Sequence, residues 1–481
     1  MGWNELLNEG RRKKGAEQKT QQKEELGAGQ QETRTEIERD YDRILFSTPV
    51  RRLADKTQVF PLDKNDSVRT RLTHSHEVSN LARSIGTTLA FVHGVGGGVK
   101  NAQRNLPAIL AATGLVHDLG NPPFGHQGES AIQSWFHENE AVLSTLEKEQ
   151  HRQDFLKFEG NAQGFRLVTR LQLLNDDYGL DLTYATLTAM MKYPVPSHVV
   201  QKNHVAKKKH GFFAAEEHVV KQIQQATGLS YGIRHPLAYV MEACDDIAYV
   251  VLDVEDSVKK GLASFPDLMA HLQHQAGIDP LVRRVIDDSQ IKHQQYQLEK
   301  LSPAELNDVS MQRFRVFAIG AMVRAAIATF INRQSEFEAG AIDKPLLELS
   351  DAESLRGALK MFGLKHGYTH RSVLRVELEG YHVIRGLMDM FWASIADRGN
   401  DGLVPKHKHP FTRFVYGRIS ENYRRIFENP TEEDQKLPVR YRECILLTDM
   451  ISGMTDSFAM NLYAELKSLQ GEFDVKKFLR E

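Results

Sequence analysis

The stretch GLVHDLGNPPFGHQGE, residues 114–129, decides the fold of this chain. It starts at the end of an apolar run, residues 105–116, and passes through a loop rich in Pro and Gly into a second helical pattern. The apolar run ends in the adjacent pair His117 and Asp118. Burying an imidazole or a carboxylate costs several kcal/mol unless the group is paired or binds a metal. We therefore expect polar chemistry at the junction of two helices.

Two other helical segments carry ionisable groups on apolar faces. In RTRLTHSHEVSNLARSIG, residues 69–86, His74 is in register with apolar residues at offsets of four, seven and eleven, whereas His76 aligns with a polar face. In HPLAYVMEACDDIAYVVLDVED, residues 235–256, Asp245 aligns with apolar residues in the same way. Three distant segments therefore point four such groups inward: His74, His117, Asp118 and Asp245.

The composition restricts the metal that such a group could bind. The chain has 20 histidines and only two cysteines, Cys244 and Cys444, so imidazole and carboxylate ligands are expected. Two imidazoles with two carboxylates suit a divalent cation such as Mn, Fe, Mg, Co or Zn. Taken singly, each of these residues is more often a hydrogen-bonded core group or a surface group. The ordered pattern H, then HD, then D on apolar helical segments is more specific than any of its parts.

The rest of the chain predicts an all-α fold. Helical periodicity recurs along the 481 residues, and sustained alternation of period two is hard to find. Residues 1–40 are rich in Gln, Glu, Lys and Arg, which predicts a polar N-terminal arm that is mobile or extended. We expect a helical core over residues 41–275 and a C-terminal helical extension over residues 276–481.

Charge and hydropathy exclude several classes of protein. The 61 basic and 63 acidic residues give a net charge of -2, so the chain lacks the global basic field of many nucleic-acid binders. Residues 1–14 lack the apolar stretch of a secretory signal. The most apolar stretch, residues 316–331, is interrupted by Arg324 and is shorter than the ~20 residues of a membrane-spanning helix. We expect a buried helix there and a cytoplasmic protein without membrane association.

Four further motifs extend the pattern: FEGNAQGFR at 158–166, MKYP at 191–194, EACDDIAY at 242–249 and ISGMTDSFA at 451–459. With the two stretches quoted first, they resemble the HD-domain deoxynucleoside triphosphate triphosphohydrolases, most closely the bacterial dGTPase branch. The resemblance implies an HD-domain helical fold and hydrolysis of dGTP, or also of other dNTPs, to deoxynucleoside and inorganic triphosphate by water attack at the α-phosphorus. It also implies a divalent metal, Mn or Mg above all and otherwise Co, Fe, Zn or Ni, bound by His74, His117, Asp118 and Asp245.

His126 and Glu129 form the candidate acid–base pair. They lie three residues apart and share a face if a helix begins there. An imidazole beside a carboxylate suits general acid–base catalysis, because the carboxylate sets the tautomer. The alternative is that His126 only caps the loop. The resemblance implies that His126 acts near the α-phosphate and that Glu129 orients it.

The resemblance also implies substrate contacts. Phosphate contacts are expected at Arg71, Asn161, Lys192 and Tyr193, whereas Arg166 is expected to be structural. The 3′-hydroxyl is expected to bond to Gln58 and Asp253, with Tyr249 beneath the deoxyribose, where it excludes a 2′-hydroxyl. On sequence alone Tyr249 is an ordinary core aromatic.

The base contacts and the partners are the least determined part of the prediction. Candidates for reading guanine are Glu421, Arg440 and Arg442, for which surface salt bridges are an equal alternative. The run Lys207–Lys209 is a solvated loop or a contact with a polyanion, either single-stranded DNA or a neighbouring subunit. The resemblance implies a homo-oligomer, often a hexamer, and a single-stranded DNA or nucleotide effector in some members. Residues 276–481 would then complete the nucleotide pocket and the oligomer contacts. The competing functions are a broad dNTP triphosphohydrolase and a catalytically silent HD protein that binds nucleotides or nucleic acid.

Overall fold

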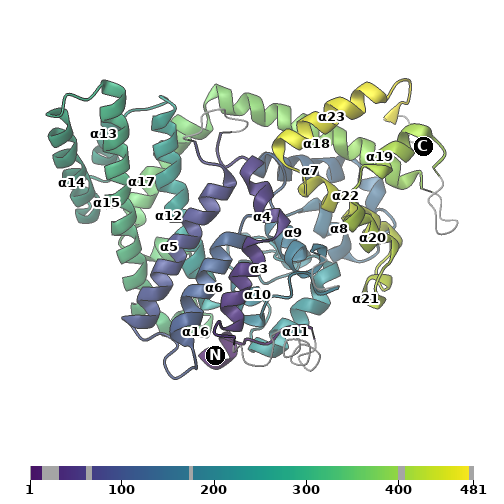
Figure 1. Ribbon diagram of the computed structural model, residues 1–481, viewed down its shortest axis with the longest axis horizontal. Coiled ribbons are helices and arrows are strands. Elements are labelled where there is room, and N and C mark those ends of the chain that lie inside the picture. Colours follow the sequence, from purple (N-terminus) through teal and green to yellow (C-terminus); the bar gives the residue numbers. More distant parts are fainter. Residues whose placement is uncertain (1, 14–31, 61–67, 173–176, 399–406, 476–481) are drawn as a thin grey trace.

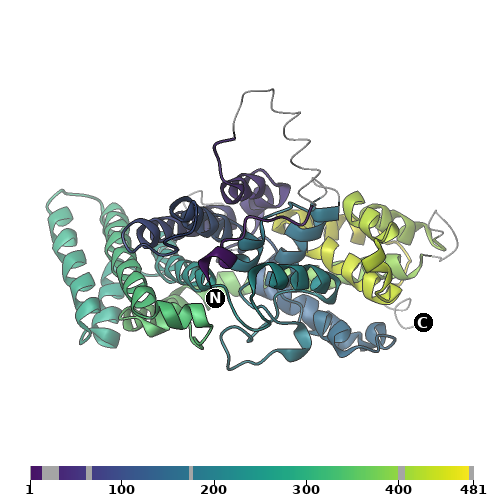
Figure 2. The ribbon, with the colours of Figure 1, turned by 90° about the horizontal axis from the view of Figure 1, so that it is seen from below.

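The computed structural model describes residues 2–13, 32–60, 68–172, 177–398 and 407–475 (Figure 1). In these residues the regular elements are helices, with two isolated β-bridges and no strand. This confirms the all-α prediction. The helices form a central group and two outer groups at opposite ends of the long axis, as Figures 1 and 2 show.

The central group is built on α5 (Arg71–Phe91), α6 (Ala102–Val116) and α12 (Pro236–Lys259), which pack on one another. The helix α5 begins after Thr70, whose hydroxyl accepts the Thr73 amide and caps the first turn. The backbones of α5 and α6 approach closely because Gly114 has no side chain: a Cβ there would lie 2.8 Å from the Ser79 Cα. Ser79 donates to the Ala111 carbonyl across this contact. This close approach brings together the ends of the helices that carry the predicted metal ligands.

One outer group covers the far side of α12. It contains α13 (Phe265–Ala276), α14 (Pro280–Gln297), α15 (Pro303–Asn332), α16 (Gln334–Ala339) and α17 (Glu353–Gly363). By length and composition α15 is the one helix in the described part of the chain that could cross a membrane. Its inner face, with Met311, Phe314 and Met322, lies in the main apolar core and packs on α12 and α14. We therefore interpret α15 as a core helix whose other face, at Val316, is exposed.

The other outer group joins early and late parts of the chain. A second apolar core, centred on Trp135, Phe155, Phe391 and Tyr441, holds it together. The early helices are α7 (Gly125–Glu138) and α8 (Glu149–Leu156). The late helices are α18 (Arg371–Ala396), α19 (Pro410–Gly417), α20 (Glu421–Glu428), α21 (Glu432–Gln435), α22 (Val439–Ser452) and α23 (Asp456–Leu469). Residues 276–481 therefore contribute to both ends of the molecule.

Shorter helices connect these groups. They are α9 (Gly160–Arg166), α10 (Tyr184–Met190) and α11 (Glu217–Thr227). The predicted structural role of Arg166 is confirmed at the junction of α9 and α22. Its buried guanidinium lies 2.6 Å from Glu216 and 2.8 Å from Asp449. Such a charge is costly to bury without its partners, so these two ion pairs tie α9 to α22 and to the turn at residues 214–216.

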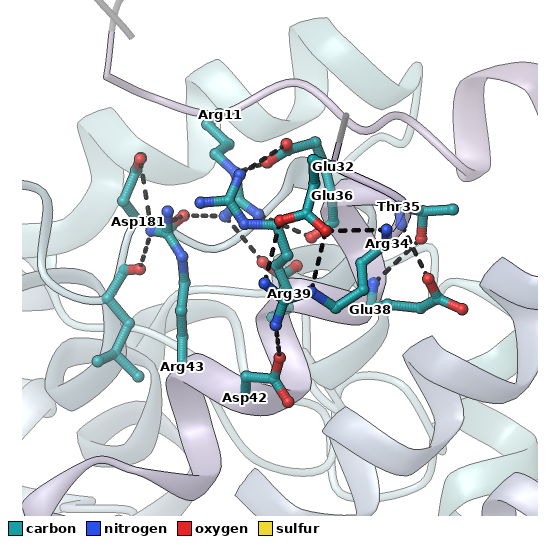
Figure 3. A network of polar contacts seen from close by, with 12 residues as sticks. Arg11, Glu32, Arg34, Thr35, Glu36, Glu38, Arg39, Asp42, Arg43 and Asp181 are labelled. Atoms are coloured by element: carbon teal, nitrogen blue, oxygen red, sulfur yellow. Dashed lines mark hydrogen bonds and ion pairs between the residues drawn. The ribbon is translucent and has the colours of Figure 1, made fainter. Parts of the chain in front are cut away.

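The described parts of residues 1–40 pack against the core, so the prediction of a mobile or extended arm is wrong for residues 2–13 and 32–40. Helix α1 (Trp3–Leu6) places Leu6 in the interior, and α3 (Glu36–Leu45) begins at a capping box on Thr35. Figure 3 shows the ion pairs around Arg11, which lies 2.8 Å from Glu36 and 2.8 Å from the buried Asp40. The amino-acid composition of residues 1–40 does not indicate that these charges pair with one another. Helix α4 (Thr48–Arg52) follows, and residues 14–31 lie outside the described residues.

Candidate active site

The four predicted metal ligands meet at the junction of α5, α6 and α12. The Nε2 atoms of His74 and His117 lie 3.3 Å and 3.4 Å from the same oxygen, Oδ1 of Asp245. His117 Nε2 also lies 3.5 Å from Asp118 Oδ2. Ligand atoms of His74, His117 and Asp118 all lie within 4.8 Å of one another. Two imidazoles and two carboxylates that converge in this way fit a divalent cation.

Neighbouring groups orient these ligands. His117 Nδ1 lies 2.7 Å from the Gly114 carbonyl, so Nδ1 carries the hydrogen and Nε2 faces the cluster. Asp118 accepts hydrogen bonds from Asn121 at 2.6 Å and from Arg71 at 2.6 Å. Burial acts to lower the pKa of His117, but the Asp118 and Asp245 carboxylates outweigh it and raise that pKa to about 9. The cluster thus concentrates negative potential, which a cation would neutralise.

The cluster opens into a cavity of about 470 Å³, within the range of small-molecule binding sites (~300–1,000 Å³). Three of the four predicted metal ligands line this cavity: His117, Asp118 and Asp245. The fourth, His74, is buried and does not line it. The other predicted residues that line it are Gln58, Arg71, His126, Glu129, Asn161, Lys192, Tyr193 and Tyr249.

The predicted acid–base pair lies at the start of α7. His126 is in the first turn, and its Nδ1 lies 3.3 Å from Glu129 Oε2. Glu129 is buried, and its other oxygen accepts the Gly160 amide at 2.7 Å. A Cβ at position 160 would lie 2.8 Å from Glu129 Oε1 and 2.3 Å from Asn121 Oδ1, so this close approach requires glycine. The hydrogen bond that His126 donates to the Glu129 carboxylate raises the pKa of His126, which keeps the imidazole protonated to higher pH.

Cationic groups also line the cavity. Lys192 Nζ lies 3.5 Å from Glu242 and 3.7 Å from Asp245. Lys209 Nζ lies 2.7 Å from Glu159, and Lys209 lines the cavity. The solvated-loop interpretation of the 207–209 run is therefore wrong for Lys209, because the loop folds back over the site.

The predicted hydroxyl contacts lie around a pair of tyrosines. The rings of Tyr249 and Tyr368 stack with centroids 5.5 Å apart and planes at 6°. Tyr368 donates from its hydroxyl to Asp253, which is buried and does not itself line the cavity. The Oε1 of Gln58 is buried without a hydrogen-bond partner, so it is free to accept a hydroxyl. A sugar contact by Asp253 stays a prediction, since Tyr368 lies in front of it.

Three cavity residues come from parts of the chain that no motif identified. Leu364 and Tyr368 belong to the π-helical turn η8 (Leu364–Tyr368), and Glu377 belongs to α18. Among the described residues, the three predicted guanine contacts do not line this cavity. Arg440 lies over the Trp392 ring, and Arg442 lies near Phe427. Glu421 is exposed at the start of α20.

The comparisons with known proteins agree with this geometry. The profile of the HD domain matches residues 71–170. The chain is 34% identical to a deoxyguanosinetriphosphate triphosphohydrolase-like protein of Listeria monocytogenes, over 98% of this chain and 100% of the relative. It is 35% identical to a protein of the same description from Synechocystis, with the same coverage. It is 33% identical to the deoxyguanosinetriphosphate triphosphohydrolase of Salmonella enteritidis, over 90% of this chain and 94% of the relative. The chain therefore belongs to the HD-domain deoxyguanosinetriphosphate triphosphohydrolase family.

Proposed function

We propose that this protein hydrolyses dGTP to deoxyguanosine and inorganic triphosphate with the help of a divalent metal, Mn or Mg. One observation carries the proposal: a two-imidazole, two-carboxylate cluster shares a cavity with the His126–Glu129 pair and with cationic groups. The names of the relatives support the same substrate.

Different cavity residues have different roles in the proposed reaction. Arg71, Lys192 and Lys209 offer charge-assisted hydrogen bonds to a triphosphate, and Tyr193 adds a phenol. A divalent cation bound by the four ligands supplies Lewis-acid polarisation of a phosphoryl oxygen and lowers the pKa of water. When water oxygen bonds to the α-phosphorus, the bond from that phosphorus to the 5′-oxygen breaks. Protonated His126 gives its proton to the 5′-oxygen, which leaves as a hydroxyl of the deoxynucleoside. The attacking water loses one proton to solvent and leaves a hydroxyl on the α-phosphorus, and His126 takes a proton back from solvent.

Glu377 supports the preference for guanine. Glu377 lines the cavity, and burial raises the pKa of its carboxyl while the charge of His126 acts to lower it. Guanine presents two adjacent donors on its pairing edge, N1–H and the N2 amino group, and a carboxylate accepts from both. Adenine and the pyrimidines do not present that pair of donors. The alternative is a broad dNTP triphosphohydrolase, in which this carboxylate faces solvent.

The product profile tests the reaction. Incubation with Mn²⁺ and each dNTP is expected to give deoxynucleoside and intact triphosphate, fastest from dGTP, as measured by anion-exchange chromatography. Monophosphate with pyrophosphate as products would contradict the proposed bond cleavage. Equal rates on the four dNTPs would favour the broad triphosphohydrolase.

Removal of a metal ligand is expected to abolish both metal binding and turnover. Losing groups that only orient a ligand costs ~10–100-fold, so His117→Ala is expected to lower activity by more than ~100-fold. Binding of Mn²⁺ is measured by calorimetry on the same variant. His76→Ala is the matched control, because His76 is exposed on the helix that carries His74. Full activity in His117→Ala would contradict the site.

The pH dependence tests the role of Glu129. Because Glu129 raises the pKa of His126, the acidic imidazole survives to higher pH, and activity is lost as pH rises through that pKa. Glu129→Gln is expected to move this basic limb of kcat to lower pH and to reduce kcat by ~10²-fold. Glu138→Gln, on the surface end of α7 beside Arg385, is the control. An unmoved basic limb would refute the proton donation by His126.

Replacement of Glu377 tests the base preference. Glu377→Gln is expected to lower kcat/KM for dGTP by about 10–100-fold, which corresponds to the ~1.5–3 kcal/mol of a charged hydrogen bond. The rates for dATP and dCTP are expected to change little. The control is Glu379→Gln, which pairs with Arg375 on the same helix. A parallel loss for all four dNTPs would show that Glu377 does not read the base.

A further inference from the structure

A buried carboxylate in the last helix binds two segments that flank the cavity. Asp456 is the first residue of α23 and is 1% exposed. One carboxylate oxygen accepts the Thr57 amide at 3.0 Å and also the Thr57 hydroxyl. The other accepts the Phe124 amide at 3.0 Å. Asp456 itself does not line the cavity, so any influence on the reaction passes through these two residues.

Thr57 holds the phosphate side of the site. Its carbonyl accepts from Arg71 Nε at 2.9 Å, and Arg71 then donates to the metal-ligand candidate Asp118. The next residue, Gln58, lines the cavity. A shift of Thr57 would therefore move Arg71 and Gln58 together.

Phe124 holds the acid–base side. It has a φ of 61°, a left-handed conformation that a residue with a Cβ rarely adopts, and it immediately precedes the first turn of α7. Two contacts hold it there. Its amide donates to Asp456, and its ring packs against α18, where a Cβ at Gly380 would lie 2.4 Å from the ring. His126 lies two residues later, so the conformation of Phe124 sets where that imidazole enters the cavity.

A second buried group ties the same segments together. Lys56, which is 4% exposed, donates to the Asn121 carbonyl at 2.6 Å and to the Ser452 carbonyl at 2.8 Å. Asn121 belongs to the loop before His126, and Ser452 ends α22. The turn between α22 and α23 therefore bonds to the 56–58 segment and to the 121–124 loop at separate points.

We propose that Asp456 is a positioning residue for the hydrolysis: one buried carboxylate, by holding Thr57 and Phe124, fixes Arg71 relative to His126. A carboxylate suits this place because it accepts from donors on both sides. An amide has a single acceptor oxygen, and its NH₂ group would face either the Thr57 or the Phe124 amide. Misplacement of a reacting group by ~1 Å costs about 10²-fold in rate.

The kinetic test rests on the proposed function and compares Asp456→Asn with Ser457→Ala. Ser457 donates to Asp55 on the exposed side of the same turn, so its loss is expected to leave kcat unchanged. Asp456→Asn is expected to lower kcat by about 10–100-fold, because misplaced reacting groups slow the reaction. KM is expected to change less than threefold, and Mn²⁺ binding is expected to be retained. In a His126→Gln background the same change is expected to cost less than in the unaltered protein, because only the Thr57–Arg71 side of the site is then left to be misplaced. Full kcat in Asp456→Asn, or an equal loss in both backgrounds, would overturn the proposal.

A second measurement does not depend on turnover. Hydrogen exchange at the amides of Thr57 and Phe124 is expected to accelerate in Asp456→Asn and to stay unchanged in Ser457→Ala. Unchanged exchange at both amides would refute the positioning role even if the enzyme is inactive. Absence of turnover in the unaltered protein would instead refute the proposed function. Should Asp456→Asn fail to fold, Thr57→Val removes one donor and keeps the shape, and it is expected to lower kcat in the same direction.

Discussion

The architecture depends on two carboxylates, Asp118 and Asp245, that lie near each other away from bulk solvent. Their charges repel each other and lose hydration, so each needs positive or hydrogen-bonding partners. The imidazoles of His74 and His117 and the ammonium of Lys192 lie near Asp245, and the guanidinium of Arg71 pairs with Asp118. These partners come from α5, the end of α6 and the motif at residues 191–194, so the carboxylates can be stabilised only when distant segments have packed. The packing of these helices and the formation of the site therefore depend on each other.

Periodicity predicted two of the candidate ligands, His74 and Asp245, because each lies within a regular helix, whereas His117 and Asp118 follow the end of α6. The face of an α-helix follows from spacing alone, and His74 and Asp245 have apolar neighbours at helical offsets. The predicted acid–base pair also followed from local spacing, since His126 and Glu129 share the first turns of α7. The HD-domain helical fold could thus be predicted from segments that are short and self-contained.

The residues that escaped prediction reach the cavity through tertiary packing. Tyr368 lies in a π-helical turn, and Glu377 lies on a helix whose other face packs against α7. Neither has a local pattern that sets it apart from a surface residue. Lys209 was predicted to be part of a solvated run of charges, because the sequence of such a run does not indicate that the loop folds toward the cavity. The prediction of a mobile N-terminal arm was wrong for a related reason. The side chain of Arg11 is buried and pairs with Asp40, which lies 29 residues later in the chain.

The segment that matches the HD domain could not form this site without the remainder of the chain. Residues 71–170 supply His74, His117, Asp118 and the acid–base pair. The fourth candidate ligand, Asp245, lies on α12, and the cationic Lys192 and Lys209 lie between residue 170 and α12 in the sequence. The late helices also contact the HD segment outside the cavity: Asp449 pairs with Arg166, and Asp456 accepts a hydrogen bond from the Phe124 amide. Phe124 connects these late helices to the candidate acid–base residue His126, since its left-handed backbone precedes His126 and is held by groups more than 250 residues further along the chain.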